Sequence, residues 1–144
     1  MTLTDKVKAD LTSAMRAREK DRVGTLRLVL SELQKDAKEG KGDELAVLRR
    51  ERKRRHESAR AFRDGGRPEL AEAEEAEAEL IEGYLPAEIA DDDLERIVAD
   101  AIAQAGAQSP KDMGKVMPVA MQAVAGRADG RRVSDKVKEA LQQG

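Results

Sequence analysis

A glycine-bounded basic turn, Gly126-Arg127-Ala128-Asp129-Gly130 followed by Arg131 and Arg132, is the stretch whose residue types best suit ligand chemistry. Helix termination and helix capping explain the glycines and Asp129, because glycine ends helices and aspartate caps them. That explanation does not require the three arginines. Guanidinium groups beside the free amides of a helix N-terminus are suited to binding phosphate. The turn therefore indicates an anion-binding site.

The other candidates for chemistry are a histidine and an acidic stretch. His56 is the only histidine, and the chain has no cysteine that could be paired with it as a base or a ligand. The carboxylates from Glu72 to Glu79 are spread around one predicted helix, whereas hard cations need several converging oxygens. The sequence therefore predicts no catalytic residue, no metal site and no cofactor.

A run of six basic residues, from Arg49 to Arg55 and interrupted only by Glu51, precedes His56. On a helical wheel these residues point nearly all ways round, and Arg52 and His56 fall on the narrow apolar stripe. The run can meet nucleic-acid phosphates, or it can pair with the glutamate-rich helix that follows the Gly65-Gly66 turn. We favour an antiparallel hairpin of a basic and an acidic helix, because it explains both biased segments. We expect it to pack through Leu48, Phe62, Leu70 and Tyr84.

Composition indicates an all-α protein that recognises ligands through charge. Charged residues make up 39 % of the 144 residues and aromatic residues 1 %, and apolar residues recur at helical spacings without a strand pattern. So few aromatic side chains argue against a deep, aromatic-lined small-molecule pocket. No apolar run is long enough for a signal peptide or a membrane span, so we expect a cytoplasmic protein without a membrane partner.

Charge is strongly partitioned along the chain. The net charge is +6 over residues 1–65, −11 over residues 66–108 and +3 over residues 109–144. This asymmetry indicates intramolecular pairing or a partner that meets only part of the surface. Pro86 lies in a connection that a core would not cross, and we therefore predict an N-terminal helical domain over residues 1–86 and a C-terminal domain over residues 87–144.

The predicted C-terminal domain holds three helices. The first is capped by Asp91-Asp92-Asp93 and ends at Gly106, and the second begins with Ser109 as N-cap and Pro110 in the first turn. Met113, Val116, Met117, Ala120, Met121 and Val124 recur at spacings of three and four, which is typical of a core-facing helix. Pro118 interrupts this pattern and is expected to kink the helix or split it near Met117.

Two blocks of the sequence resemble the GatB/YqeY family, and in particular its small free-standing YqeY-like members. The first block is RRHESARAFRDGGRPELAEAEEAEAELIEGYLP over residues 54–86, and the second is DMGKVMPVAMQAVAGRADGRRVSDKVKEAL over residues 112–141. The resemblance implies a helical N-terminal domain and a small three-helix C-terminal domain. It also implies a likeness to the tRNA-recognising tail of the tRNA-dependent amidotransferase B subunit, whose separate catalytic part this chain is too short to contain.

Carried onto this sequence, the resemblance implies an RNA-facing region. It comprises Met113 to Met117 and the glycine-bounded turn, with the binding residues Lys115, Arg127, Asp129, Gly130, Arg131 and Arg132. Pro118 departs from the usual continuation of that helix. We therefore expect a non-catalytic protein that binds tRNA, or that acts with an aminoacyl-tRNA or an amidotransferase component. Two alternatives are a protein–protein adaptor without RNA binding, and a subunit that contributes to glutamine-dependent amide transfer.

Overall fold

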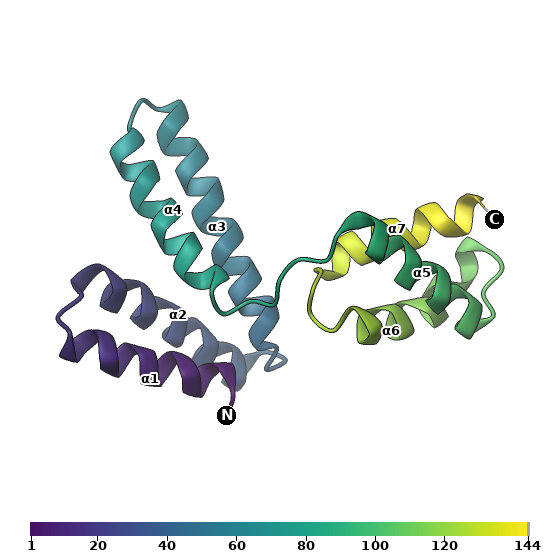
Figure 1. Cartoon of the computed structure of the whole chain (residues 1–144), viewed down its shortest axis with the longest axis horizontal. Coiled ribbons are helices and arrows are strands. Elements are labelled where there is room, and N and C mark those ends of the chain that lie inside the picture. Colours follow the sequence, from purple (N-terminus) through teal and green to yellow (C-terminus); the bar gives the residue numbers. More distant parts are fainter. Residues whose placement is uncertain (144) are drawn as a thin grey trace. The chain divides into compact units, whose positions relative to one another are not determined.

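The computed structural model describes residues 1–143, and these residues form α-helices and one short 3₁₀ turn, without a strand (Figure 1). The all-α prediction is therefore confirmed. The chain divides into two compact units, Met1–Leu85 and a second unit from Pro86 onward. That each unit is an independent domain, with the boundary at residues 86/87, stays a prediction.

The first unit begins with a hairpin of α1 (Leu3–Arg16) and α2 (Lys20–Glu39). Thr2 and Asp5 form a capping box, in which each side chain accepts a hydrogen bond from the other residue's backbone amide. The turn between the helices places Arg18 in the left-handed region, at a φ of 59°, which is uncommon for a residue with a Cβ. Capping and an apolar stripe thus define α1 from its sequence.

The basic segment α3 (Glu44–Asp64) and the acidic segment α4 (Pro68–Glu82) form the predicted hairpin. Asp43 caps α3 by accepting a hydrogen bond from Ala46, and Pro68 occupies the first turn of α4. Ion pairs join the helices in antiparallel register, since Arg63 contacts Glu75 while His56 contacts Glu82.

The contacts expected within this hairpin are partly wrong. Phe62 and Leu70 are only half-buried, whereas Ala59, Ala71 and Ala78 are buried in the interface. Small side chains let two helix backbones approach closely, and these three alanines are buried residues on the facing sides of α3 and α4. Leu48 is buried, but it packs in the core shared with α1 and α2.

The core of the first unit lies where the two hairpins meet. It is built from buried side chains of all four helices: Val7, Ala14, Leu26, Val29, Leu33, Val47, Leu48 and Ile81. The end of α4 is fastened to α1 because the Tyr84 hydroxyl donates a hydrogen bond to Asp10. Burial and that hydrogen bond raise the pKa of Tyr84, because both favour the protonated phenol.

The second unit contains α5 (Asp91–Ala105), the 3₁₀ turn η1 (Pro110–Asp112), α6 (Met113–Val124) and α7 (Gly130–Gln143). Its core is an aliphatic cluster in which every helix takes part: Leu94, Val98, Ala101, Val116, Ala120, Val124, Val133, Val137 and Leu141, together with Ile89 and Ala128. The methionines Met113, Met117 and Met121 are partly buried and pack against it. The apolar spacing therefore identified the correct face of α6.

Pro118 does not split the second helix of this unit. The helix α6 is continuous from Met113 to Val124 with Pro118 inside it. Proline in a helix interior costs roughly 3 kcal/mol. Burial of Val116, Ala120 and Val124 against α5 and α7 supplies tertiary packing that outweighs this loss.

Two predicted caps also differ. Ala90 is the N-cap of α5. The three aspartates lie in the first turn, where their negative charges interact favourably with the helix dipole but make no capping hydrogen bond. Ser109 makes no capping hydrogen bond, because Pro110 begins the 3₁₀ turn η1 rather than α6 itself. Gly106 ends α5 in the left-handed conformation, as predicted.

Candidate functional site

The glycine-bounded turn joins α6 to α7, and its shape is fixed by backbone conformation, burial and capping hydrogen bonds. Ala125 and Gly126 both adopt positive φ, at 52° and 81°, which reverses the chain direction. Ala128 is fully buried, and the carbonyl of Arg127 accepts a hydrogen bond of 2.9 Å from the amide of Ile89. Asp129 caps α7, as predicted, by accepting a hydrogen bond of 2.8 Å from the amide of Arg132.

Two arginines of this turn are engaged by the protein itself. Arg127 donates from Nε to the carbonyl of Val124 at 2.9 Å and from Nη2 to that of Ala123 at 3.1 Å, so it satisfies the end of α6. Arg132 contacts Asp91 at 2.6 Å and Glu88 at 3.1 Å. The hydrogen bond from Arg132 holds the pKa of Asp91 below its usual value.

Lys115 and Arg131 are the more accessible cations among those predicted to bind RNA. The side chain of Lys115 is 69 % exposed and lies 3.7 Å from Asp112, and Arg131 is exposed at the first turn of α7. A structural role thus accounts for Arg127 and Arg132, in addition to Asp129 and the glycines. That Lys115, Arg127, Asp129, Gly130, Arg131 and Arg132 bind RNA stays a prediction.

The basic helix α3 turns a different face inward from the one expected. Glu51 and Arg55 are buried at 2 % and 6 % exposure, while His56 is exposed and Arg52 is half-buried. The buried positions continue the stripe of Leu48 and Ala59 at helical spacing. A helical wheel that considers only apolar residues misses this face, because such a wheel places no charged side chains in the interior.

Glu51 and Arg55 form a buried ion pair one helical turn apart. Nη1 of Arg55 lies 2.8 Å from Oε1 of Glu51. Nε of Arg55 lies 3.7 Å from Oε2 of Glu77 on α4, beyond hydrogen-bond distance. The signal that could have revealed the pair was Glu51 itself, the one acidic residue inside a basic run, with an arginine four residues later.

The carboxylate of Glu74 lies beside this pair and predicts a pH-dependent stability. Burial and repulsion by Glu77 raise the pKa of Glu74 above its usual value of 4.5. Glu74→Gln should therefore increase the free energy of unfolding at pH 7 by about 0.2–0.5 kcal/mol, the scale of a like-charge helical pair. The folded wild type binds this proton more readily than the unfolded chain does. The advantage of the variant should thus vanish below about pH 4.

Urea denaturation of both proteins at pH 7 and pH 4 measures this difference. Glu79→Gln on the same helix is the matched control, because Glu79 is exposed. An equal gain from the two variants at pH 7 would show that general charge reduction, rather than the Glu74–Glu77 contact, sets the effect.

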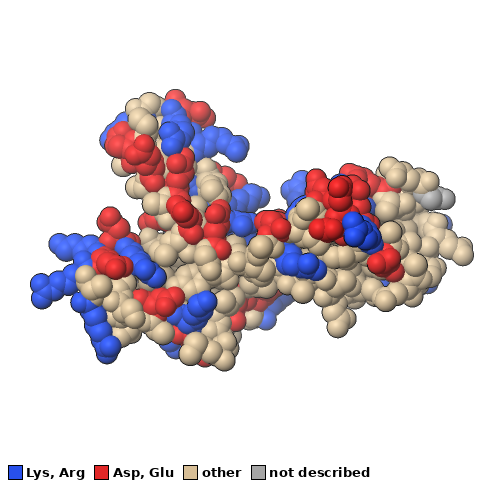
Figure 2. All heavy atoms as spheres, viewed as in Figure 1, with Lys and Arg blue, Asp and Glu red and all other residues tan. Residues whose placement is uncertain are grey.

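A second basic surface lies around the turn between α1 and α2. Residues 16–27 contain five basic residues and only two acidic ones, Glu19 and Asp21. All five basic side chains are exposed: Arg16, Arg18, Lys20, Arg22 and Arg27. Figure 2 shows Lys and Arg atoms gathered at this free end of the hairpin. Sequence reasoning did not single out this α1–α2 basic end, although five basic residues in twelve were a readable signal.

The remaining candidates have structural partners. His56 lies 3.1 Å from Glu82, and both side chains are about half exposed. Within residues 1–143, no group of three His, Cys, Asp or Glu side chains is arranged to hold a metal ion. None of the helices in that range combines the length and the apolarity that a membrane span requires.

The comparison with known families covers nearly the whole chain, since residues 4–141 match the Yqey-like protein family. The chain belongs to this family. It is similar to "Altered inheritance of mitochondria protein 41, mitochondrial" of Pyrenophora tritici-repentis, with 28 % identity over 94 % of this chain and 79 % of that protein. An uncharacterised protein of Schizosaccharomyces pombe is 33 % identical over 56 % of this chain and 69 % of its own length.

Proposed function

We propose that this YqeY-like protein is a non-catalytic protein that binds tRNA or associates with a tRNA amidotransferase, and that it recognises RNA by backbone charge and shape. The observation that carries the proposal is the α1–α2 basic end. Arg16, Arg18, Lys20 and Arg27 are exposed there, and no ion pair joins them to a carboxylate within residues 1–143. Arg22 has a 3.7 Å contact with Glu19 and also interacts with the side chain of Tyr84. These cations therefore remain available to an anionic partner.

Recognition through phosphates fits the composition of the chain. Tyr84 and Phe62 are the only aromatic residues, and both are at least partly buried. Single-stranded bases are usually read by stacking on aromatic side chains, whereas folded RNA is read by shape and backbone charge. An exposed group of arginines on a rigid hairpin suits the second mode. The resemblance to the amidotransferase tail supports tRNA as the RNA class.

A protein–protein adaptor is the second candidate. In this alternative the acidic helix α4 docks a basic partner, but Arg63, His56 and Arg55 already face Glu75, Glu82 and Glu77 within the hairpin. Pairing within the chain leaves less of that acidic face for a partner. A role in amide transfer is the third candidate, and no arrangement of side chains within residues 1–143 supports it specifically.

Retained RNA and salt-dependent binding test the proposal. Purified protein should carry nucleic acid, which its ultraviolet absorbance ratio reports, and should bind tRNA in a filter or fluorescence assay. Four phosphate contacts would give a log–log dependence of affinity on salt with a slope of roughly −3 to −4. If binding is absent, or if its affinity does not change with salt, the adaptor hypothesis replaces the RNA proposal.

A further inference from the structure

The buried ion pair of α3 leaves two polar atoms without hydrogen bonds. Oε2 of Glu51 and Nε of Arg55 are inaccessible to solvent and have no hydrogen-bond partner among the described residues. The nearest opposite charges are too far away, with Arg54 at 3.5 Å from Glu51 and Glu77 at 3.7 Å from Arg55. Buried polar atoms in this state cost about 1–3 kcal/mol each, and nearly all such atoms in native proteins have a partner.

Both residues line a hollow between α2, α3 and α4. Its volume is about 350 Å³, and its other lining side chains are Leu28, Ser31, Glu32, Arg54, Ser58, Glu74 and Glu77. A water molecule needs roughly 30 Å³, so the space exceeds what a single bridging water requires. Leu28 is 56 % exposed and is one of the few exposed large apolar residues of the chain. The hollow thus combines carboxylate acceptors, one of them buried, with an exposed apolar side chain.

The charge of the hollow is unbalanced toward acceptors. Glu32, Glu51, Glu74 and Glu77 contribute four carboxylates, whereas Arg54 and Arg55 contribute two guanidinium groups. Arg50, outside the lining, contacts Glu32 and Glu51, so the net charge is −1 when it is included. Burial and the neighbouring Glu77 make the charged form of Glu74 unfavourable and raise its pKa. A ligand that supplies positive charge and several N–H donors would relieve both conditions.

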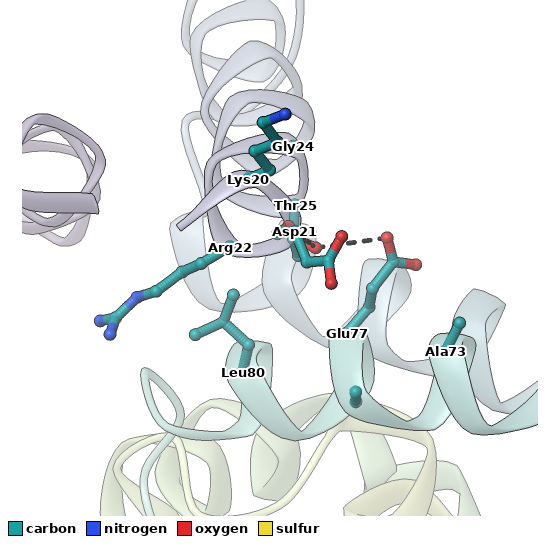
Figure 3. Close-up of a pocket in the computed structure, with 9 residues that line it drawn as sticks. Lys20, Asp21, Arg22, Gly24, Thr25, Ala73, Glu77 and Leu80 are labelled. Atoms are coloured by element: carbon teal, nitrogen blue, oxygen red, sulfur yellow. Dashed lines mark hydrogen bonds between the residues drawn. The ribbon is translucent and has the colours of Figure 1, made fainter. Parts of the chain in front are cut away.

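A second hollow of about 520 Å³ lies between α2 and α4, and its lining shares Glu77 with the first. Figure 3 shows Glu77 of α4 reaching toward Thr25 of α2, with Leu80 and Ala73 on either side of it along α4. Thr25 donates a hydrogen bond of 3.2 Å to Glu77, which lines both hollows. A Cβ added at Gly24 would meet no atom within 4 Å, so the wall there is open. An alkyl chain entering at Glu77 therefore has room to extend.

We propose that this cleft between α2, α3 and α4 binds an alkyl cation, a guanidinium or primary ammonium group on an apolar stem. The cationic head donates to the carboxylates of Glu74 and Glu77, next to the buried carboxylate of Glu51. The stem lies against Leu28 and along the small side chains of Gly24 and Ala73. This chemistry belongs to free alkyl diamines and guanidines and also to an arginine or lysine side chain of another protein. The inference does not depend on RNA binding.

Titration with two probes tests the site and its source. The first probe is agmatine, and the second is a blocked, alanine-rich helical peptide with a single arginine. Amide chemical shifts of the ¹⁵N-labelled full chain should change saturably at Thr25, Leu28 and Ser58. Saturation by agmatine assigns the site to small molecules, and saturation by the peptide alone assigns it to a protein segment.

The variant Glu74→Gln should weaken binding of the active probe about tenfold, because it removes one charge-assisted contact. It should leave the fold intact, since it also removes a like-charge repulsion. The control Glu79→Gln, exposed on the same helix, should bind as the wild type does. If neither probe saturates in the millimolar range, or if the two variants weaken binding equally, the proposal is wrong and the orphaned atoms are satisfied by water.

Discussion

Arg55→Met is expected to lower the free energy of unfolding by about 3 kcal/mol, among the largest losses that one substitution in this chain should produce. The change leaves the carboxylate of Glu51 buried at 2 % exposure without its 2.8 Å partner. The remaining cations near Glu51 are Arg54 and Arg50, at 3.5 Å and 3.8 Å, with side chains at least half exposed. They compensate only in part, which places the loss at the lower end of the range for broken buried pairs.

Urea denaturation monitored by circular dichroism measures the loss. Lys53→Met is the matched control, because Lys53 is exposed on the same helix and the change should stay within about 0.5 kcal/mol. The double variant Glu51→Leu with Arg55→Met should recover most of the stability, since an apolar pair can replace a buried ion pair at little cost. A double variant as unstable as Arg55→Met would mean that packing, rather than the uncompensated charge, causes the loss.

Local signals made most of the helices predictable from the sequence. Thr2, Asp43, Pro68 and Gly106 act at helix ends through interactions with neighbouring residues, so their roles can be deduced without tertiary structure. The hairpin of α3 and α4 was equally predictable from the sequence, because two helices of opposite charge on either side of a short turn have few other arrangements. The alanine residues at its interface were not predicted, since apolar patterns favour large side chains such as Phe62.

The sites depended on contacts between distant residues, which one sequence does not reveal. Arg132 meets Glu88 and Asp91 more than 40 positions away, and this pairing removes much of the free charge that its position in the turn suggested. The side chain of Arg127 turns back and donates a hydrogen bond to the end of α6. The position of Arg127 just beyond the helix allows this contact, but the sequence alone does not establish that it forms. Four cations of the α1–α2 basic end, by contrast, have no ion pair within residues 1–143: Arg16, Arg18, Lys20 and Arg27. Their exposure follows from a short turn at the free end of a hairpin.

Reversing two charges at the α1–α2 basic end, with Arg18→Glu and Arg27→Glu together, is expected to weaken tRNA binding about a hundredfold at low salt. Each arginine would lose a charge-assisted contact with phosphate, worth about 1.4 kcal/mol or more per position. The slope of log affinity against log salt should become shallower by about 1.4–1.8, because two fewer phosphates are neutralised. Thermal stability should change little, since both side chains are exposed.

The matched comparison is Lys115→Glu with Arg131→Glu, which reverses the two accessible cations around the glycine-bounded turn and spares the engaged Arg127 and Arg132. If the tRNA-binding residues carried over from the amidotransferase tail are the principal contacts, this variant should lose binding while the Arg18/Arg27 variant retains it. Equal losses would show that both units touch the same RNA, since each pair lies in a different unit. If the wild type binds tRNA and both double variants bind it equally well, neither the α1–α2 basic end nor the glycine-bounded turn is the RNA-binding surface. The remaining exposed cations of α3, Lys53 and Arg60, would then be the next charges to reverse, because they lie outside the ion pairs of the hairpin.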